Sequence, residues 1–218
     1  FKPATWLPFD HWMAKIHSKL FNDLFPRALM DGQFKGIIKK AHIPEAAGTQ
    51  DFLGVNYYTW EFVRFDLTKP REMFATRFFP EDTVLSESGF IANLPGGLAE
   101  SIRWGRQFGV PIIITENGVD DSQDVLRPRY ILEHLHALWR AMNEDGIVKG
   151  YFHWSLVDNF EWERGWTQRF GLWGLDVESQ ARIRRPSVDL YAEICRMNGI
   201  SAEMVEKYSP EAMQTLFP

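Results

Sequence analysis

The spacing of apolar residues along the chain switches between helical and strand-like periods, and this pattern predicts the order of the elements. Between His11 and Leu24, apolar side chains recur with the helical period, and Asp10 precedes them as a candidate N-cap. Pro26 is expected to end or bend this helix, because proline lacks the amide hydrogen that a helix interior needs. The run DFLGVNYYTW at residues 51–60 is apolar and aromatic, which is typical of a strand.

The rest of the chain alternates helices and strands. Residues 64–93 are irregular and rich in Pro, charge and Phe, and a loop of this length is more often functional than filler. Helices are predicted at 96–109, 127–146 and 186–198, ended by Gly109, Gly146 and Gly199, with strands at 110–116, 147–156 and 169–176. Strands that alternate with long helices indicate βαβ units and a parallel sheet.

Polar and aromatic side chains gather at the carboxyl ends of these strands and in the loops just after them. They are Asn56, Tyr57, Tyr58, Glu116, Asn117, Trp154, Asp158, Glu161 and Trp162. In a (β/α) barrel, and equally in a doubly wound sheet, that edge is where chemistry takes place. No glycine-rich phosphate loop follows any strand, so nucleotide binding is disfavoured.

Composition narrows the classes of partner. The length of 218 residues suits one globular domain over 1–218, and the net charge of -5 argues against nucleic acid or anionic membrane. No apolar run is long enough to span a bilayer. The single cysteine, Cys195, excludes internal disulfides and favours a reducing compartment, so a cytoplasmic location is expected, with secretion as the alternative. Nine Trp and 17 Phe would fill a large barrel core or stack on sugars, and composition favours the core.

Glu116 is the strongest candidate for chemistry. A lone glutamate at a strand end more often caps a turn or pairs with an arginine. Here Tyr58 and Asn117 are both expected to donate hydrogen bonds to it, and Trp154 is expected at the end of the next strand. A hydrogen-bonded, ionised glutamate in an aromatic pocket suits a carboxylate nucleophile.

The loop after residue 156 holds the other polar candidates. Glu161 beside Trp162 offers a carboxylate and an indole N–H to two sugar hydroxyls, with Trp154 stacking on the ring. Asp158 and Asn159 are more simply explained as turn residues.

The histidines favour structural roles. His134 and His136 are two residues apart on a helix, which is wrong for the i, i+4 pairing of a helical zinc site, and His153 lies inside a strand. Ser155 lacks a G-x-S-x-G context, so a serine hydrolase is disfavoured. No metal and no cofactor are expected.

Three segments together resemble glycoside hydrolase family one, the retaining β-glucosidases and their relatives. ITENG (114–118) is similar to the family's nucleophile motif, residues 150–172 to its long sugar-binding signature, and DFLGVNYYT (51–59) to its fifth-strand motif. The resemblance extends over nearly the whole chain. It implies the α/β class and a (β/α)8 TIM barrel, of which this chain supplies strands five to eight.

The resemblance also implies a role for each candidate. Glu116 matches the nucleophile that forms a covalent glycosyl-enzyme, and Asn56 and Tyr58 match residues that position it and hydrogen-bond around it. The sugar-binding positions are Trp154 as platform, Glu161 and Trp162 for the outer hydroxyls, and Phe170 as a wall. Because a carboxylate at Glu161 would repel a phosphate, the expected substrate is a non-phosphorylated β-glycoside or oligosaccharide.

One element of the family pattern is missing. Retaining glycosidases need a second carboxyl group as acid and base, and the family supplies it from an Asn-Glu-Pro motif that does not occur here. Glu45 and Glu81 each follow a proline, but neither follows an asparagine or a predicted strand.

A half-barrel is therefore expected, with sheet edges and an apolar interior left exposed. It would need the missing N-terminal half or a second copy of itself. The alternative is a non-catalytic half-barrel that self-associates or binds sugars without cleaving them.

Overall fold

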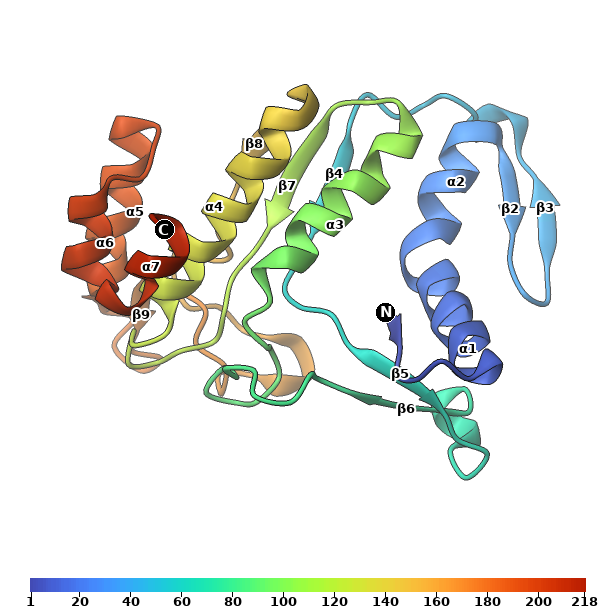
Figure 1. Cartoon of the computed structure of the whole chain (residues 1–218), viewed down its shortest axis with the longest axis horizontal. Coiled ribbons are helices and arrows are strands. Elements are labelled where there is room, and N and C mark those ends of the chain that lie inside the picture. Colours follow the sequence, from blue (N-terminus) through green and yellow to red (C-terminus); the bar gives the residue numbers. More distant parts are fainter. The chain divides into compact units, whose positions relative to one another are not determined.

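The chain divides into two units, each with its own core (Figure 1). A computed structural model describes residues 1–218, the side chain of Asp145 excepted. The first unit takes in Phe1–Leu53, Trp60–Thr83 and Gly105–Pro111, and the second takes in Gly54–Thr59, Val84–Trp104 and Ile112–Pro218. The seven site residues predicted from the sequence all belong to the second unit.

A three-stranded sheet and a long helical segment make up most of the first unit. Strand β1 (Lys2–Pro3) runs parallel to β5 (Phe62–Phe65), and β5 pairs antiparallel with β6 (Ala75–Phe78). Helix α1 (Pro8–Ser18) packs against β5. The core formed there consists of Met13, Ala14, Val63 and Ala75.

Helix α1 begins earlier than expected, and the predicted N-cap is wrong. Pro8 occupies the first turn, where its fixed φ favours a helix start, so Asp10 lies inside the helix. The Asp10 carboxylate is buried and accepts hydrogen bonds from Thr5 Oγ1 (2.7 Å) and from the Phe65 amide (2.8 Å). It therefore joins α1 to β5 instead of capping the helix.

The helical segment also continues past the point where Pro26 was expected to end it. A π-helical turn, Lys19–Asp23, leads into α2 (Leu24–Asp31), which closes at Gly32 in the left-handed conformation. Because the wider turn precedes the proline, its missing amide falls where the hydrogen-bond ladder is already irregular. The antiparallel hairpin β2 (Gln33–Lys35) and β3 (Lys40–His42) follows.

The expectation of irregular structure throughout residues 64–93 is wrong in part. Strand β5 extends to Phe65, and β6 returns alongside it. Asp66 closes the first turn between them by accepting from the Thr68 amide (2.9 Å) and the Thr68 hydroxyl (2.6 Å). The polar turn residues between β5 and β6 mask the strand pattern in the sequence, so these short strands were not predicted.

The second unit is built on the sheet β4–β7–β8. Its strands are β4 (Leu53–Asn56), β7 (Ile112–Glu116) and β8 (Val148–Tyr151), and β7 and β8 run parallel. The helices between and after them are α3 (Pro95–Gly105), α4 (Arg127–Asp145), α5 (Pro186–Met197), α6 (Ala202–Tyr208) and α7 (Met213–Leu216). The predicted alternation of strands and helices is confirmed here.

Two expected details of the second unit are wrong. The strand predicted at 169–176 is shortened to β9 (Trp173–Leu175), which pairs antiparallel with β10 (Arg182–Arg184) and shares only one parallel bridge, between Trp173 and Val157, with the segment after β8. Helix α5 ends with Asn198 in the left-handed position, one residue before the expected Gly199. Asparagine tolerates that conformation through local side-chain hydrogen bonding.

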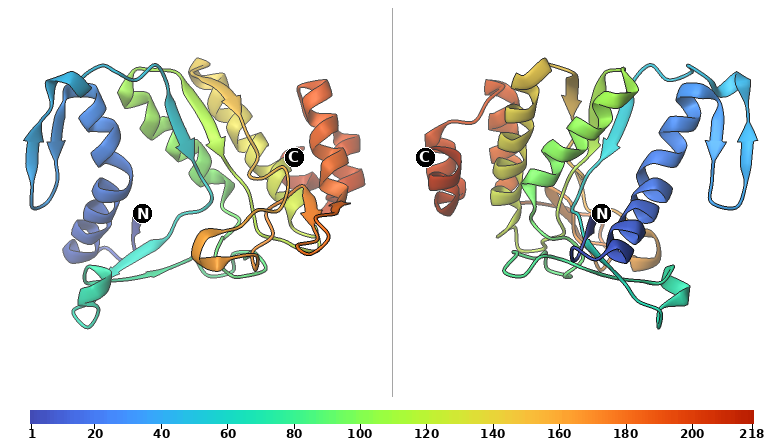
Figure 2. Two further views of the ribbon diagram at one scale, coloured as in Figure 1. Left: turned by 180° about the vertical axis from the view of Figure 1, so that it is seen from behind. Right: turned by 45° about the vertical axis from the view of Figure 1, so that its right-hand side comes forward.

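The two faces of the β4–β7–β8 sheet differ in burial. Helices α3 and α4 lie behind the strands in the left view of Figure 2, and Val55, Ile112 and Ile114 on that face are buried. The alternate positions Asn56 and Lys149 are exposed. This period of two is the pattern of a sheet covered on one face only.

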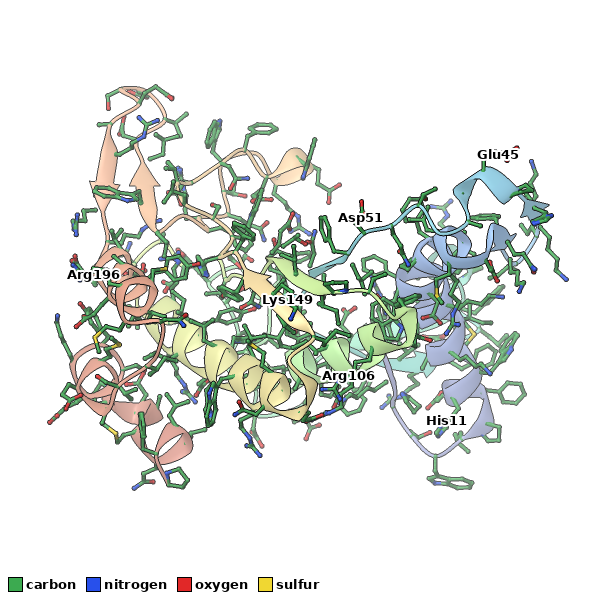
Figure 3. The ribbon with its side chains drawn as sticks, turned by 90° about the horizontal axis from the view of Figure 1, so that it is seen from above. His11, Glu45, Asp51, Arg106, Lys149 and Arg196 are labelled. Carbon is green, nitrogen blue, oxygen red and sulfur yellow. The ribbon has the colours of Figure 1, made fainter. Side chains whose placement is uncertain are left out.

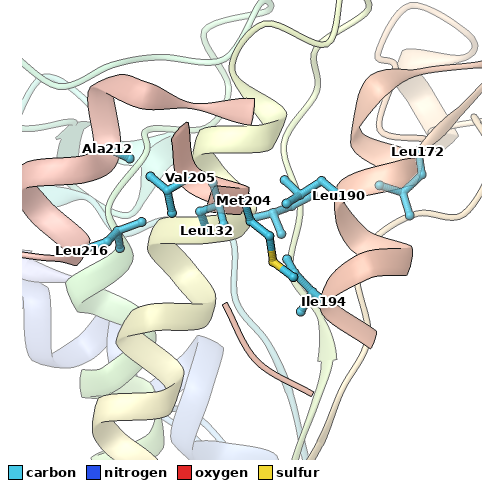
Figure 4. Packing of buried hydrophobic residues seen from close by; sticks show 9 residues of the cluster. Leu132, Leu172, Leu190, Ile194, Met204, Val205, Ala212 and Leu216 are labelled. Atoms are coloured by element: carbon cyan, nitrogen blue, oxygen red, sulfur yellow. The ribbon is translucent and has the colours of Figure 1, made fainter. Parts of the chain in front are cut away.

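Helix packing supplies one core of the second unit (Figure 4). Side chains from α4, α5, α6 and α7 meet there with Leu172 and with Ala212 of the short 3-10 turn before α7. The members are Ile131, Leu132, Leu172, Leu190, Ile194, Met204, Val205, Ala212 and Leu216. Because each large aliphatic side chain contributes roughly 1.5–3 kcal/mol when buried, this cluster holds the C-terminal helices on α4.

Candidate active site

Glu116 is the last residue of β7, and its carboxylate is hydrogen-bonded to a tyrosine. The β-branched run before it is buried, and the Tyr57 amide donates to the Glu116 carbonyl (2.9 Å), so the ends of β4 and β7 lie together. The Tyr58 hydroxyl donates to Glu116 Oε2 at 2.6 Å. Burial, and then this hydrogen bond, raise the pKa of Tyr58 far above 10, so its phenol stays protonated and remains a donor.

Asn117 does not contact the Glu116 carboxylate, and the expected hydrogen bond between them is wrong. Its side chain is fully buried and turns to the opposite side of the strand end. Asn117 Nδ2 donates to the Tyr57 carbonyl (2.7 Å) and to the Tyr130 hydroxyl (3.0 Å), and Oδ1 accepts from the Tyr151 hydroxyl (2.9 Å). The hydroxyls of Tyr130 and Tyr151 therefore hold the Asn117 side chain away from the Glu116 carboxylate.

The ends of β7 and β8 approach each other closely at Gly118. The Trp154 amide donates to the Asn117 carbonyl at 2.9 Å. A Cβ added to Gly118 would lie 1.8 Å from the Trp154 carbonyl oxygen, so no other residue fits without a backbone shift. The Trp154–Ser155 peptide that follows is cis.

Trp154 and Glu161 form a second polar pair in this unit. Trp154 Nε1 donates to Glu161 Oε1 at 3.0 Å, and Asn159 Nδ2 donates to the same oxygen at 2.7 Å. Sequence reasoning placed the indole of Trp162 beside Glu161, whereas the structure supplies that of Trp154. The negative charge of Glu161 also contributes to the raised pKa of Tyr58, after burial and the larger contributions of Glu116.

Phe170 packs beneath Tyr58. The two rings meet edge-on with centroids 6.0 Å apart, and Phe170 is buried. It belongs to a cluster with Ile91, Val119 and Tyr130, against which Tyr58 and Trp154 pack. Tyr58, which binds Glu116, and Trp154, the predicted sugar platform, therefore pack on the same apolar cluster.

Two predicted site residues lie outside both the Tyr58–Glu116 and Trp154–Glu161 pairs and the aromatic cluster beneath them. Asn56 is exposed, and its Oδ1 accepts from Thr115 Oγ1 at 2.6 Å, so it contacts the residue before Glu116. Trp162 is 84% exposed, in the short 3-10 turn Trp162–Arg164.

The buried and exposed carboxylates outside this group have other surroundings. Asp158 is buried in an ion pair with Arg185 (2.9 Å) and accepts from the Gly171 amide (2.8 Å), which ties its loop to the start of α5. Glu45, labelled in Figure 3, and Glu81 are exposed and belong to the first unit.

Sequence reasoning missed Tyr130 and Tyr151 as neighbours of the site. Tyr130 lies on α4, and its hydroxyl donates to the Tyr58 carbonyl at 2.8 Å. Its apolar helical position signals only burial, and hydrogen bonding of a buried tyrosine hydroxyl is the one clue the sequence offers.

Among the described residues, no group of three or more His, Cys, Asp or Glu side chains is placed to hold a metal ion. None of the helices in that part of the chain combines the length and hydropathy that a membrane span requires. His134 and His153 are buried at their ring nitrogens, and burial lowers the pKa of each to about 3.

Solved structures with this fold define the class of protein. A β-glycosidase from Pyrococcus horikoshii superimposes with a TM-score of 0.86 and 32% identity, over 95% of this chain and 48% of its own. A β-glucosidase from Thermotoga maritima in complex with glucoimidazole superimposes with a TM-score of 0.78 and 26% identity, over 92% of this chain and 49% of its own. These neighbours are (β/α)8 barrel β-glycosidases.

Sequence comparison gives the family. Residues 17–200 match the model of glycosyl hydrolase family 1, and the chain belongs to that family. A β-galactosidase of Pyrococcus woesei is 34% identical over 212 residues, which are 88% of this chain and 40% of the relative. The human cytosolic β-glucosidase is 34% identical over 232 residues, which cover 89% of this chain and 49% of the relative. The chain thus spans about half the length, or less, of the relatives it matches.

Proposed function

We propose that this chain is the C-terminal half of a retaining β-glycosidase, formed by strands five to eight of its barrel, with Glu116 as the nucleophile. The observation that carries the proposal is the hydrogen bond of 2.6 Å from the Tyr58 hydroxyl to Glu116 Oε2 at the end of a parallel strand. The donor binds one carboxylate oxygen and leaves the other free to attack. Membership of glycosyl hydrolase family 1 supports the same reaction class.

The mechanism has two displacements. Glu116 attacks the anomeric carbon, the bond to the leaving oxygen breaks, and a glycosyl ester forms; water then releases the sugar with net retention. The acid that protonates the leaving oxygen must lie about 5–5.5 Å from the nucleophile. We assign that acid to sequence outside this chain.

The sugar is bound by the residues that surround this carboxylate. Trp154 presents its ring as platform, Glu161 and Trp162 receive the outer hydroxyls, Phe170 forms a wall, and Asn56 helps to position the nucleophile. Trp154 Nε1 already orients Glu161 Oε1 at 3.0 Å, leaving the second oxygen available to a ligand. Relatives named β-galactosidase and β-glucosidase support a non-phosphorylated β-glycoside or oligosaccharide as substrate.

A partner completes the barrel. The exposed face of β4–β7–β8 carries Asn56 and Lys149, and a barrel interior is the environment in which such a face is covered. We propose the N-terminal half of the barrel as the partner, with a second copy of this chain as the alternative. A cytoplasmic location accords with the human relative's name.

The alternative function is sugar binding without hydrolysis. It is favoured by the absence of a second carboxylate beside Glu116 among the hydrogen-bonded groups that the structure describes. Light scattering measures the oligomeric state of the chain. A stable monomer of the chain alone would contradict the need for either partner, the N-terminal half or a second copy.

An experiment with an activated sugar tests the nucleophile directly. Hydrolysis of aryl β-glucosides and β-galactosides is measured for the chain with and without an N-terminal half-barrel. Glu116→Gln is expected to lower kcat at least a thousandfold, because the amide cannot form the ester. Glu163→Gln, at a carboxylate 86% exposed in the same stretch of chain, should leave kcat unchanged. Equal activity of the two variants would refute the assignment.

A further inference from the structure

Tyr130 lies behind the sheet, on α4, yet it is hydrogen-bonded to the backbone of the residue that holds Glu116. Its hydroxyl donates to the Tyr58 carbonyl at 2.8 Å, and the Tyr58 side chain donates to Glu116 at 2.6 Å. We propose that Tyr130 is a positioning residue, which holds the Tyr58 main chain so that the Tyr58 hydroxyl meets the nucleophile. The inference rests on the proposed function of Glu116.

The direction of every hydrogen bond in this network is fixed by chemistry. The Tyr57 carbonyl can only accept, so Asn117 must present Nδ2 to it, and the second Nδ2 hydrogen goes to the Tyr130 oxygen (3.0 Å). The Tyr58 carbonyl also can only accept, so the single Tyr130 proton goes there. The network therefore leads from Asn117 through Tyr130 and Tyr58 to Glu116, which is the neighbour of Asn117 in sequence.

The position of Tyr130 is itself tightly held. Its ring is fully buried and stacks on His134, with centroids 3.7 Å apart and an interplanar angle of 20°. The turn before it is anchored, because Asp121 Oδ2 accepts from the Leu126 amide (2.7 Å) and the Arg127 amide (2.9 Å). Because the Tyr130 ring is held in this way, its hydroxyl can fix the position of the Tyr58 main chain just after the end of β4.

Burial of Tyr130 and His134 also keeps the network in one protonation state. Burial, with nearby tyrosines adding to it, raises the pKa of Tyr130 well above its usual value, so the hydroxyl retains its proton. The pKa of the His134 ring is lowered to about 3 by burial, so the stacked imidazole is neutral at physiological pH. The donor to Tyr58 is therefore present throughout the neutral range.

A matched pair of variants separates positioning from simple core satisfaction. Tyr130→Phe removes the hydroxyl that reaches the Tyr58 carbonyl. Tyr57→Phe removes another buried tyrosine hydroxyl, which donates to the Leu94 carbonyl at 2.6 Å and takes no part in the network. Both keep their rings, so both are expected to fold, and equal melting temperatures verify that.

Crystal structures of the two 218-residue variants give the first readout, which does not depend on activity. In Tyr130→Phe the Tyr58 hydroxyl is expected to move beyond hydrogen-bond distance of Glu116, while in Tyr57→Phe the bond stays near its original 2.6 Å. An unchanged bond in Tyr130→Phe overturns the proposal.

Covalent labelling gives the second readout. With 2-deoxy-2-fluoro-β-D-glucosyl fluoride, the Glu116 carboxylate forms a bond to the anomeric carbon and fluoride departs with the electron pair of the broken bond, so no acid is needed. Labelling of the chain, supplied with the N-terminal half-barrel, is followed by mass. Tyr130→Phe is expected to lower the rate constant for inactivation about fivefold to tenfold, with the apparent affinity unchanged.

The two readouts distinguish the two claims. If the parent protein is labelled and Tyr130→Phe is labelled equally fast, the positioning role is refuted while the nucleophile stands. If the parent is not labelled at Glu116, the proposed function fails, and the crystal structures alone decide whether Tyr130 holds Tyr58. A similar loss of labelling in Tyr57→Phe would show a general core effect and would also refute the proposal.

Discussion

The two faces of the β4–β7–β8 sheet carry polar groups under opposite conditions. On the side covered by α3 and α4, Asp124 and Arg127 form a buried ion pair where α4 begins, and the imidazole of His134 on α4 is neutral. On the other face, Asn56 and Lys149 are exposed. A polar group on the covered face must be paired or uncharged, whereas the open face imposes no such demand. The difference indicates that the packing that stabilises the sheet is concentrated on its covered side.

Breaking the ion pair on the covered side should give the largest loss of stability. Asp124 accepts from the Arg127 guanidinium and from the Ser187 amide and hydroxyl, both at 2.7 Å. Asp124→Asn removes the ion-pair partner of the buried Arg127, so the free energy of unfolding is expected to fall by about 3–5 kcal/mol in urea titrations. Asp189→Asn is the control, because Asp189 pairs with Arg184 at the surface.

That control should unfold at the same urea concentration as the parent. A loss for Asp124→Asn no larger than for Asp189→Asn would show that the covered face does not enforce pairing.

Adjacent positions of β7 allow a direct comparison of the two faces. Ile114 is fully buried, and Ile114→Ala is expected to lower the free energy of unfolding by about 2–5 kcal/mol through lost contacts and a cavity. Thr115, the next residue, contacts the exposed Asn56, and Thr115→Ala should cost about 1 kcal/mol or less. Chemical denaturation followed by circular dichroism measures both, and equal losses would contradict a one-sided sheet.

Acid should lower the stability of the protein through two buried histidines, His134 and His153. The pKa of His134 and that of His153 are both lowered to about 3 by burial, while the unfolded chain protonates histidine near pH 6.5. The unfolded state therefore binds more protons between pH 6.5 and 3, and the free energy of unfolding falls as pH drops through that window. The slope should be on the order of 1 kcal/mol per pH unit for each histidine.

Variants can assign this slope. His134→Gln should flatten the decline in stability below pH 6.5, and His42→Gln, at an exposed position, should not. An identical pH dependence in His134→Gln would refute the assignment to buried imidazoles.

The sequence predicts strands and helices of the second unit well because their signals are local. The β-branched run before Glu116 and the left-handed glycine Gly146 are each contained in a few residues. Pro8 is a local signal for the start of α1, and it was overlooked in favour of Asp10. The course of the chain past Pro26 depends on a π turn, which no local pattern announces.

The candidate site divides in the same way. Tyr58 beside Glu116 follows from two strand ends lying together, which a parallel sheet implies. The turning away of Asn117 depends on the Tyr130 and Tyr151 hydroxyls, which come from distant parts of the chain, so the two adjacent polar residues did not reveal it. The pairing of Trp154 with Glu161 depends on how a loop folds back, so it could not be read from the order of residues.

The approach of two backbones at Gly118 constrains how this protein can be varied. Every amino acid except glycine carries the Cβ that would fall 1.8 Å from the Trp154 carbonyl oxygen, so the exclusion is independent of side-chain chemistry. A saturation library at this codon should recover glycine alone among folded, parent-like clones.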